Sequence, residues 1–102
     1  MNYGLFSGGK LCAVSIGQIK HWWQGTEYYL DELFVDPDLQ GQGLGSLLLR
    51  MIEKDIQNCG ISGIFLQTEN DKPAYAFYQK RDFKELTGHV GFYKELKDGN
   101  NR

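Results

Sequence analysis

Residues 27–56 have the pattern of a strand, a glycine-rich turn and a helix, which restricts the chain to folds that mix strands with helices. The segment EYYLDELFV is rich in aromatic and branched side chains and is stopped by Asp36-Pro37, so it predicts a strand over 27–35. After it, apolar side chains recur at helical spacing, at Leu44, Leu47, Leu48, Met51, Ile52 and Ile56. Asn58, Cys59 and Gly60 are expected to end that helix.

The remaining segments predict one mixed α/β domain with at least one parallel crossover. Strands are expected over 3–6, 11–20, 61–68, 83–86 and 89–96. Of these, 61–68 is expected to be central and covered on both faces, and the last two to form a closing hairpin. Residues 21–26 are expected to be a loop, and Pro73 to open a second helix that ends near residue 81. The core then covers about 11–96, and 97–102 is a polar tail.

Composition argues against several classes of function. The chain has 102 residues and a formal net charge of -2, so charge gives no support to nucleic-acid or membrane binding. Neither a membrane span nor a secretory signal is expected, which favours a cytoplasmic protein. Cys12 and Cys59 lack metal-ligand spacing and are expected to be buried free thiols. His21 and His89 also lack ligand spacing, so no metal is expected.

The turn QGQGLG, residues 40–45, places glycines directly before the helix. The first turn of a helix presents unpaired N–H groups and the positive end of its dipole, and glycine has no Cβ to keep an anion away. A diphosphate can therefore lie on these amides. Gly45 is not followed by Lys-Ser/Thr, which excludes the P-loop, and Ser46 replaces the third glycine of the dinucleotide fingerprint. A turn that only allows tight packing remains the alternative.

Gln40-x-x-Gly43-x-Gly45, after a strand ending in Val-Asp-Pro, resembles the acyl-coenzyme A motif of the GNAT superfamily of N-acetyltransferases. PAYAFYQKRDF, residues 73–83, is similar to the C-terminal signature of that family, and the matching residues are Ala74, Phe77, Tyr78, Lys80 and Phe83. Asp82 stands where the family usually has glycine, and aspartate tolerates left-handed geometry better than most residues. Asn70 is one residue out of register with the asparagine of the family.

The resemblance implies a GNAT-like acyl-CoA N-acyltransferase fold that is N-terminally shortened, because the usual first strand and helices have no counterpart here. It implies that a primary amine attacks the acetyl group of acetyl-CoA directly, in a ternary complex. Phe34 and Val35 are implied to pair with the pantetheine arm as an extra strand would. The turn residues implied to hold the cofactor are Gln40, Gly41, Gln42, Gly43, Leu44, Gly45 and Ser46. A homodimer is expected, since a second subunit can complete the missing wall.

The same resemblance implies two catalytic side chains. Glu32 is the candidate base, because an ammonium with a pKa near ~10 must lose a proton before it attacks. Tyr78 is the candidate acid for the departing thiolate. A solvated strand carboxylate and an aromatic core residue are the respective alternatives. Strand alternation places Asp31 on the face opposite Glu32.

Trp22 and Trp23, together with Asp31, are candidates for binding a cationic amine through cation–π contact and charge attraction. The acidic cluster in EYYLDELFV is similar to that of the small-amine acetyltransferases of the family, and this resemblance implies an aminoglycoside-like or polyamine-like acceptor. The alternative is a packed loop with solvated acids. A different class of function also stays open, namely an acyl-CoA-binding module or a fragment with a regulatory or structural role.

Overall fold

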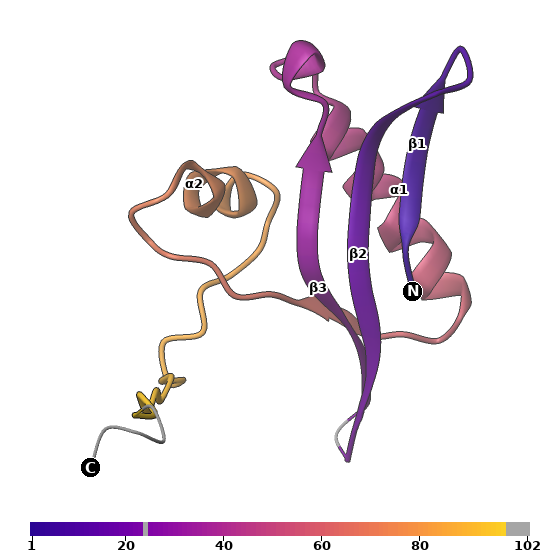
Figure 1. Ribbon diagram of the computed structural model, residues 1–102. Coiled ribbons are helices and arrows are strands. Elements are labelled where there is room, and N and C mark those ends of the chain that lie inside the picture. Colours follow the sequence, from indigo (N-terminus) through magenta and orange to yellow (C-terminus); the bar gives the residue numbers. More distant parts are fainter. Residues whose placement is uncertain (24, 98–102) are drawn as a thin grey trace.

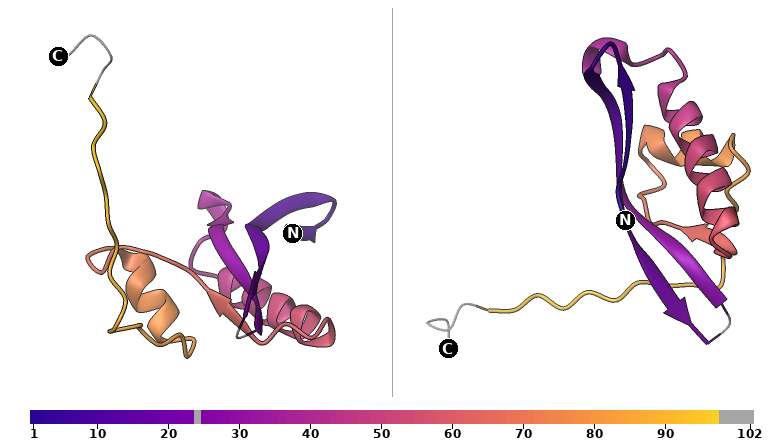
Figure 2. Two further views of the ribbon diagram at one scale, coloured as in Figure 1. Left: turned by 90° about the horizontal axis from the view of Figure 1, so that it is seen from below. Right: turned by 90° about the vertical axis from the view of Figure 1, so that its right-hand side faces the viewer.

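The computed structural model describes residues 1–23 and 25–97, which form one mixed sheet with helices on one side (Figures 1 and 2). The sheet has the order β1-β2-β3-β4, with β1 at Tyr3–Ser7, β2 at Lys10–Trp22, β3 at Gly25–Val35 and β4 at Gly63–Phe65. A 3-10 turn, η1, covers Pro37–Leu39, and the helices are α1 at Leu44–Asn58 and α2 at Pro73–Gln79. Strands β1 to β3 are antiparallel, whereas β4 is parallel to β3. The predicted mixed α/β arrangement with a parallel crossover is confirmed.

Both helices end in the same hydrogen-bonded cap. In α1, Gly60 has a φ of 79°, and the Ile61 amide donates to the Ile56 carbonyl at 3.0 Å. In α2, Asp82 takes the left-handed role with a φ of 66°, and the Phe83 amide donates to the Tyr78 carbonyl at 3.1 Å. The predicted end of α1 and the tolerance of Asp82 for this geometry are both confirmed.

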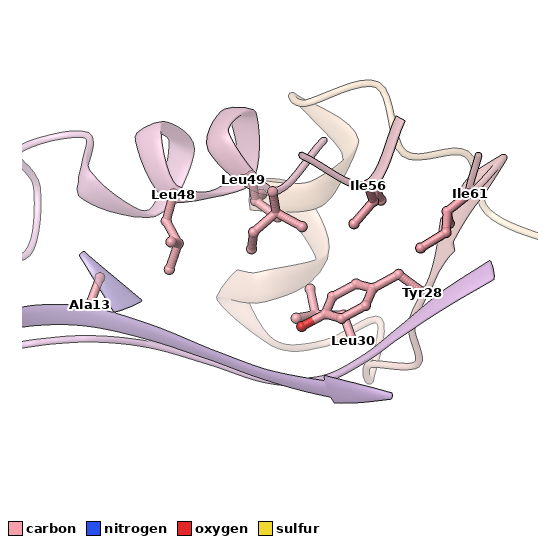
Figure 3. Close-up of a cluster of buried hydrophobic side chains, with 8 residues drawn as sticks. Ala13, Tyr28, Leu30, Leu48, Leu49, Ile56 and Ile61 are labelled. Carbon is pink, nitrogen blue, oxygen red and sulfur yellow. The ribbon is translucent and has the colours of Figure 1, made fainter. Parts of the chain in front are cut away.

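The core lies between α1 and the sheet, as Figure 3 shows. Tyr28 on β3 is fully buried in the same cluster as Ile52 and Ile56, and its hydroxyl donates to the Met1 carbonyl at 2.9 Å. The buried residues of α1 are Gly45, Leu48, Leu49, Ile52 and Ile56. Leu47 and Met51 were expected in this stripe, but they are 37% and 47% exposed because the buried face of the helix is rotated toward Leu49.

A β-bulge changes which residues of β3 face the core. The pairing of β2 with β3 shifts between Ile16 and Gly17, and this shift leaves Asp31 as the extra residue of β3. Leu30 is buried in the core, and Leu33 also packs against it, although strict alternation puts them on opposite faces. Asp31 and Glu32 are both exposed between them. The expectation that these two carboxylates lie on opposite faces is therefore wrong.

The strand after α1 differs from its prediction. β4 has three residues instead of the eight expected over 61–68, and it lies at the edge of the sheet instead of its centre. It pairs with β3 only from Glu27 to Tyr29. Beyond Tyr29 the two strands part, and the rest of β3 has no strand partner on that side among the described residues.

The predicted closing hairpin is wrong for the part of the chain that the structure describes. Residues 83–97 contain no strand, and beyond Glu85 the chain leads away from the body of the molecule (Figure 2). The radius of gyration is accordingly 16.5 Å, above the value of about 13 Å expected for this length. A hairpin needs a neighbouring strand for stability, and β4 is too short to supply one. The polar tail beyond residue 97 lies outside the described residues.

Two smaller expectations are also corrected. The predicted loop over 21–26 belongs largely to the β2–β3 hairpin, because β2 continues to Trp22 and β3 begins at Gly25. Cys12 is a buried free thiol as expected, but Cys59 is exposed at the end of α1. The helix-ending position of Cys59 keeps its side chain outside the core.

Candidate active site

The turn before α1 forms an open cradle of backbone amides. Gly43 is the N-cap of α1 with φ 76° and ψ 14°, and Gly41 has a φ of 84°. A Cβ built on either glycine meets nothing within 4 Å, so the space beside this backbone is open. No side chain caps the helix at Gly43, and the first intrahelical hydrogen bond joins the Leu47 amide to the Gly43 carbonyl at 3.0 Å. The amides before Leu47 therefore lack intrahelical acceptors and can bind an anion.

Gly45 has a different role from the other two glycines of the turn. It is buried, and a Cβ at this position would lie 3.1 Å from Cζ of Phe77 and 3.7 Å from Cγ2 of Val35. The absent side chain thus allows α2 to pack closely on the start of α1. Tight packing, which was the alternative interpretation of the whole turn, explains this glycine but not Gly41 or Gly43.

The corner between β3 and the turn is fixed by Asp36. Its amide donates to the Cys12 carbonyl at 2.8 Å, which ties the corner to β2. Its carboxylate accepts a hydrogen bond from the Asp38 amide at 3.0 Å and forms an ion pair with Lys10 at 3.2 Å. Two contacts hold the pKa of Asp36 below its usual range: the Asp38 amide has the larger effect and Lys10 the smaller. The Asp36 carboxylate is therefore ionised at neutral pH.

Arg81, two residues beyond the end of α2, contacts the first turn of α1. Its Nε donates to Ser46 Oγ at 2.5 Å, and its Nη1 donates to the Phe77 carbonyl at 2.8 Å. The guanidinium also lies 3.8 Å from the centroid of the Phe77 ring. Sequence reasoning missed Arg81, because it lies 35 positions after Ser46 and no local pattern indicates the contact.

A cavity of about 210 Å³ opens where β3 and β4 part. It brings together the predicted base and the predicted acid, since both Glu32 and Tyr78 line it. Asp31 lines the same cavity, as does Phe34. The other lining residues are Leu30, Leu33, Leu66, Gln67, Thr68 and Ala74. Asp31, Glu32 and Tyr78 thus all line one hollow beside the unpaired length of β3.

Tyr78 is half-buried, with its ring between two others. The ring centroids of Phe77 and Phe83 each lie 5.2 Å from that of Tyr78, in edge-to-face contact. Burial raises the pKa of Tyr78 above its ordinary value of 10.0, which keeps the phenol protonated throughout the neutral range. The side chain therefore combines a packed ring with a hydroxyl that can act as a proton donor.

The two tryptophans are not brought to this cavity. Trp22 and Trp23 lie at the tip of the β2–β3 hairpin and are 51% and 91% exposed. Gly25, which pairs with Trp22, lies about 20 Å along β3 from Glu32 at the usual rise per strand residue. The bulge, by contrast, brings Asp31 to the cavity together with Glu32.

Two further features bear on the type of site. Within residues 1–23 and 25–97, no three His, Cys, Asp or Glu side chains are grouped so that they could hold a metal ion. No helix in the described part of the chain is long and apolar enough to cross a membrane.

The fold is that of solved acetyltransferases. An aminoglycoside acetyltransferase from an uncultured soil metagenomic sample, solved in complex with sisomicin, superposes with a TM-score of 0.79 at 19% identity. The superposition covers 94% of this chain and 65% of that one. A possible acetyltransferase from Clostridium difficile 630 gives a TM-score of 0.80 at 17% identity, over 94% of this chain and 66% of the other.

The chain belongs to the acetyltransferase (GNAT) family, whose model matches residues 2–83. It is similar to the [ribosomal protein bS18]-alanine N-acetyltransferase of Escherichia coli K12, with 31% identity over 94 residues and 91% of this chain. It is also 28% identical over 72 residues to the thialysine N-epsilon-acetyltransferase of Bos taurus, which is 70% of this chain and 42% of that protein. The chain spans 61% of the length of the Escherichia coli relative.

Proposed function

We propose that the chain carries an acetyl-CoA-dependent N-acetyltransferase site that acts on a primary amine, with a small cationic molecule as acceptor. The observation that carries this proposal is that Glu32 and Tyr78 line the same cavity, where β3 loses its partner strand. The open amide cradle at Gly41 and Gly43 follows the same strand. Membership of the acetyltransferase family supports the same reaction type.

The residues present fit acetyl-CoA in two respects. Beside Gly43 and Gly41 there is open space that a Cβ would enter, and the amides of residues 42–46 can hold a diphosphate there. The unpaired edge of β3 at Phe34 and Val35 can bind an amide-bearing arm as an added strand would. When bound, acetyl-CoA supplies the acetyl thioester.

Glu32 and Tyr78 handle the protons of the transfer. Glu32 removes one proton from the ammonium of the acceptor, directly or through water, and passes it to solvent. The nitrogen loses its second proton to solvent once its bond to the acetyl carbon has formed. Tyr78 donates a proton to the sulfur as the carbon–sulfur bond breaks. Asp31 adds negative charge to the same cavity, which attracts a cationic acceptor.

The acceptor has a second candidate, the amino terminus of a protein. The 31% identity to an alanine N-acetyltransferase that acts on a ribosomal protein favours it. The test is thiol release from acetyl-CoA with an aminoglycoside, a polyamine and an alanine-terminated peptide. We expect turnover with a small polyamine or aminoglycoside. Turnover with the peptide alone would select the second candidate, and thermal stabilisation by CoA without turnover would leave an acyl-CoA-binding module.

Replacing Tyr78 by phenylalanine is expected to lower kcat about 10-fold to 100-fold, because the thiolate then leaves without a proton donor. The KM for acetyl-CoA should stay within about twofold, since the packed ring is retained. Steady-state kinetics at pH 7.5 measures both constants. Tyr75→Phe is the matched control, because Tyr75 also lies on α2 but its hydroxyl donates to Glu85 at 2.6 Å, outside the cavity. Equal kcat values for Tyr78→Phe and the wild type would remove the acid role.

We also propose that the chain forms a homodimer. The face of the sheet opposite α1 carries exposed apolar side chains, among them Ile16 at 37% and Phe34 at 52%. The segment after α2 exposes Val90, Phe92, Tyr93 and Leu96 by 80% or more. Surface of this kind is usually covered by another element or subunit. Light scattering should give twice the 11.7 kDa chain mass at micromolar concentration, and a stable monomer would contradict the dimer.

A further inference from the structure

Gln67 brings a side-chain amide to the cavity that Glu32 and Tyr78 line, and the proton transfers proposed above do not use it. It lies two residues beyond the end of β4. The hydroxyl of Tyr29 donates to Oε1 of Gln67 at 3.1 Å. A side-chain amide has one acceptor oxygen and two N–H donors. Because Tyr29 engages the oxygen, the N–H groups of Nε2 are left to donate to a ligand, and they have no partner within the described part of the chain.

Tyr29 holds this amide from outside the cavity. It forms the last pair of β3 with β4, opposite Phe65, and the two ring centroids lie 5.6 Å apart. The ammonium of Lys20, on β2, lies 5.7 Å from the centroid of the Tyr29 ring. These contacts with both neighbouring strands restrict the ring, so its hydroxyl is a fixed donor where the strands part. Tyr29 is not among the residues that line the cavity, and it can act on a ligand there only through Gln67.

Asp31 lies at the same level on the other side of the gap. The parallel register pairs Tyr29 with Phe65, and Asp31 and Gln67 each follow two residues later. Both line the cavity. The Asp31 carboxylate accepts one hydrogen bond, from Nε2 of Gln18 to Oδ2 at 3.3 Å, and no described residue donates to its Oδ1. The gap therefore has an anionic acceptor on the β3 side and a neutral amide donor on the other.

A hydroxyl group fits between these two side chains because it can donate and accept at once. Its hydrogen can go to the Asp31 carboxylate while its oxygen accepts from Nε2 of Gln67. The neutral form of a plain alkyl amine must use its nitrogen for the attack, so it has no second atom that accepts from the amide. A carbonyl oxygen can accept from the amide but cannot donate to the carboxylate. A site that hydrogen-bonds a substrate hydroxyl discriminates against the analogue that lacks it.

We infer that Gln67, held by Tyr29, selects acceptors that carry a hydroxyl beside the reacting amine, which are amino alcohols, a class that includes amino sugars. This inference rests on the proposed function, because it assumes that the acceptor amine enters this cavity. Gln67 is then a residue that determines specificity, and Tyr29 is a positioning residue. Neither takes part in the proton transfers assigned to Glu32 and Tyr78.

The test compares two acceptors that differ by one hydroxyl, trans-2-aminocyclohexanol and cyclohexylamine, in the wild type and in Gln67→Met. Methionine keeps the unbranched stem and removes the amide. We expect kcat/KM for the amino alcohol to fall about 5-fold to 10-fold, the usual effect of one hydrogen bond, through a rise in KM. The value for cyclohexylamine should change by less than about twofold. Comparing each acceptor between the two proteins cancels the difference between the amine pKa values of the acceptors.

Tyr29→Phe keeps the ring and removes only the hydroxyl that holds Gln67. It should reproduce part of the loss, about twofold to fivefold, and again only for the amino alcohol, which a general loss of stability would not do. Gln79→Met is the matched control, because Gln79 also pairs with a tyrosine, Tyr75, at 3.1 Å, but neither residue lines this cavity. It should leave kcat/KM for both acceptors within about twofold of the wild type.

An equal loss for both acceptors in Gln67→Met would overturn the inference, and so would a similar loss for the amino alcohol in Gln79→Met. A loss with an alanine-terminated peptide in place of the amino alcohol would also overturn it, by assigning Gln67 to a peptide carbonyl. If the wild type acetylates neither amine, the proposed function fails. Calorimetric titration with the two amines then compares the same affinities without turnover, and it still decides the role of Gln67.

Discussion

Gly43→Val is expected to abolish CoA binding. The valine would place branched carbons in the open space beside the amides, where the diphosphate is proposed to lie. It would also force a β-branched residue to a φ of 76°, which costs about 1–2 kcal/mol. Displacing a diphosphate from several charge-assisted N–H bonds, each worth about 1.5–3 kcal/mol, weakens binding by more than about a hundredfold. Calorimetry with CoA should then show no measurable heat.

Gly60→Val separates this effect from strain alone. Gly60 lies at the other end of α1, has a φ of 79° and also has nothing within 4 Å of an added Cβ. The backbone cost is therefore the same, but the site is not touched. We expect both variants to lose similar stability in thermal unfolding, with CoA affinity kept in Gly60→Val. Loss of CoA binding in both variants would show that strain in α1 is enough to abolish binding. The result would then give no support to a diphosphate site at the turn before α1.

Glu32→Gln is expected to lower kcat/KM by about 10²-fold to 10⁴-fold at pH 7, the usual contribution of a general base. At this pH only about one amine in a thousand is neutral without help, because its pKa is near ~10. Raising the pH supplies neutral amine from solution, so the deficit of the variant should shrink between pH 7 and pH 9. The pH profiles of kcat/KM for both proteins measure this convergence.

Asp31→Asn is the matched partner of that variant, because Asp31 is adjacent and lines the same cavity. We expect it to raise the KM of a cationic acceptor severalfold with little change in kcat, since it removes attraction and not the base. A collapse of kcat in Asp31→Asn with near-normal kcat in Glu32→Gln would reverse the two roles. The bulge makes this comparison necessary, because it exposes both carboxylates on one strand.

The sequence predicted the centre of the fold well, for physical reasons. The strand over 27–35 and the helix from Leu44 carry strong local signals, since branched and aromatic residues favour strands and apolar periodicity favours a helix. The ends of both helices were also predictable, because Gly60 and Asp82 take the left-handed geometry that a helix cap requires. These features depend on nearby residues alone.

The features that the sequence did not predict depend on distant partners. The bulge at Asp31 arises from its pairing with β2, and strict alternation carries no trace of it. Residues 83–96 have strand-forming side chains, but strand formation needs an edge to pair with, and β4 offers only three residues. In both places tertiary context overrode local pattern.

The candidate site shows the same division. Gly43, Gly45 and Tyr78 were indicated by motif spacing, which is local, and the structure places Glu32 in the same cavity as Tyr78. Arg81 was missed because its contact with Ser46 forms only when α2 packs on α1. The tryptophans were expected near the acceptor from their place before β3, but strand length carries them to the far end of the hairpin.

A crystal structure of the protein crystallised with excess acetyl-CoA tests most directly whether the turn before α1 binds the diphosphate. We expect density for a diphosphate within hydrogen-bond distance of the amides of residues 42–46, with the pantetheine arm along Phe34 and Val35. Density for the cofactor elsewhere on the molecule, or a turn filled by a side chain of the protein itself, would contradict it.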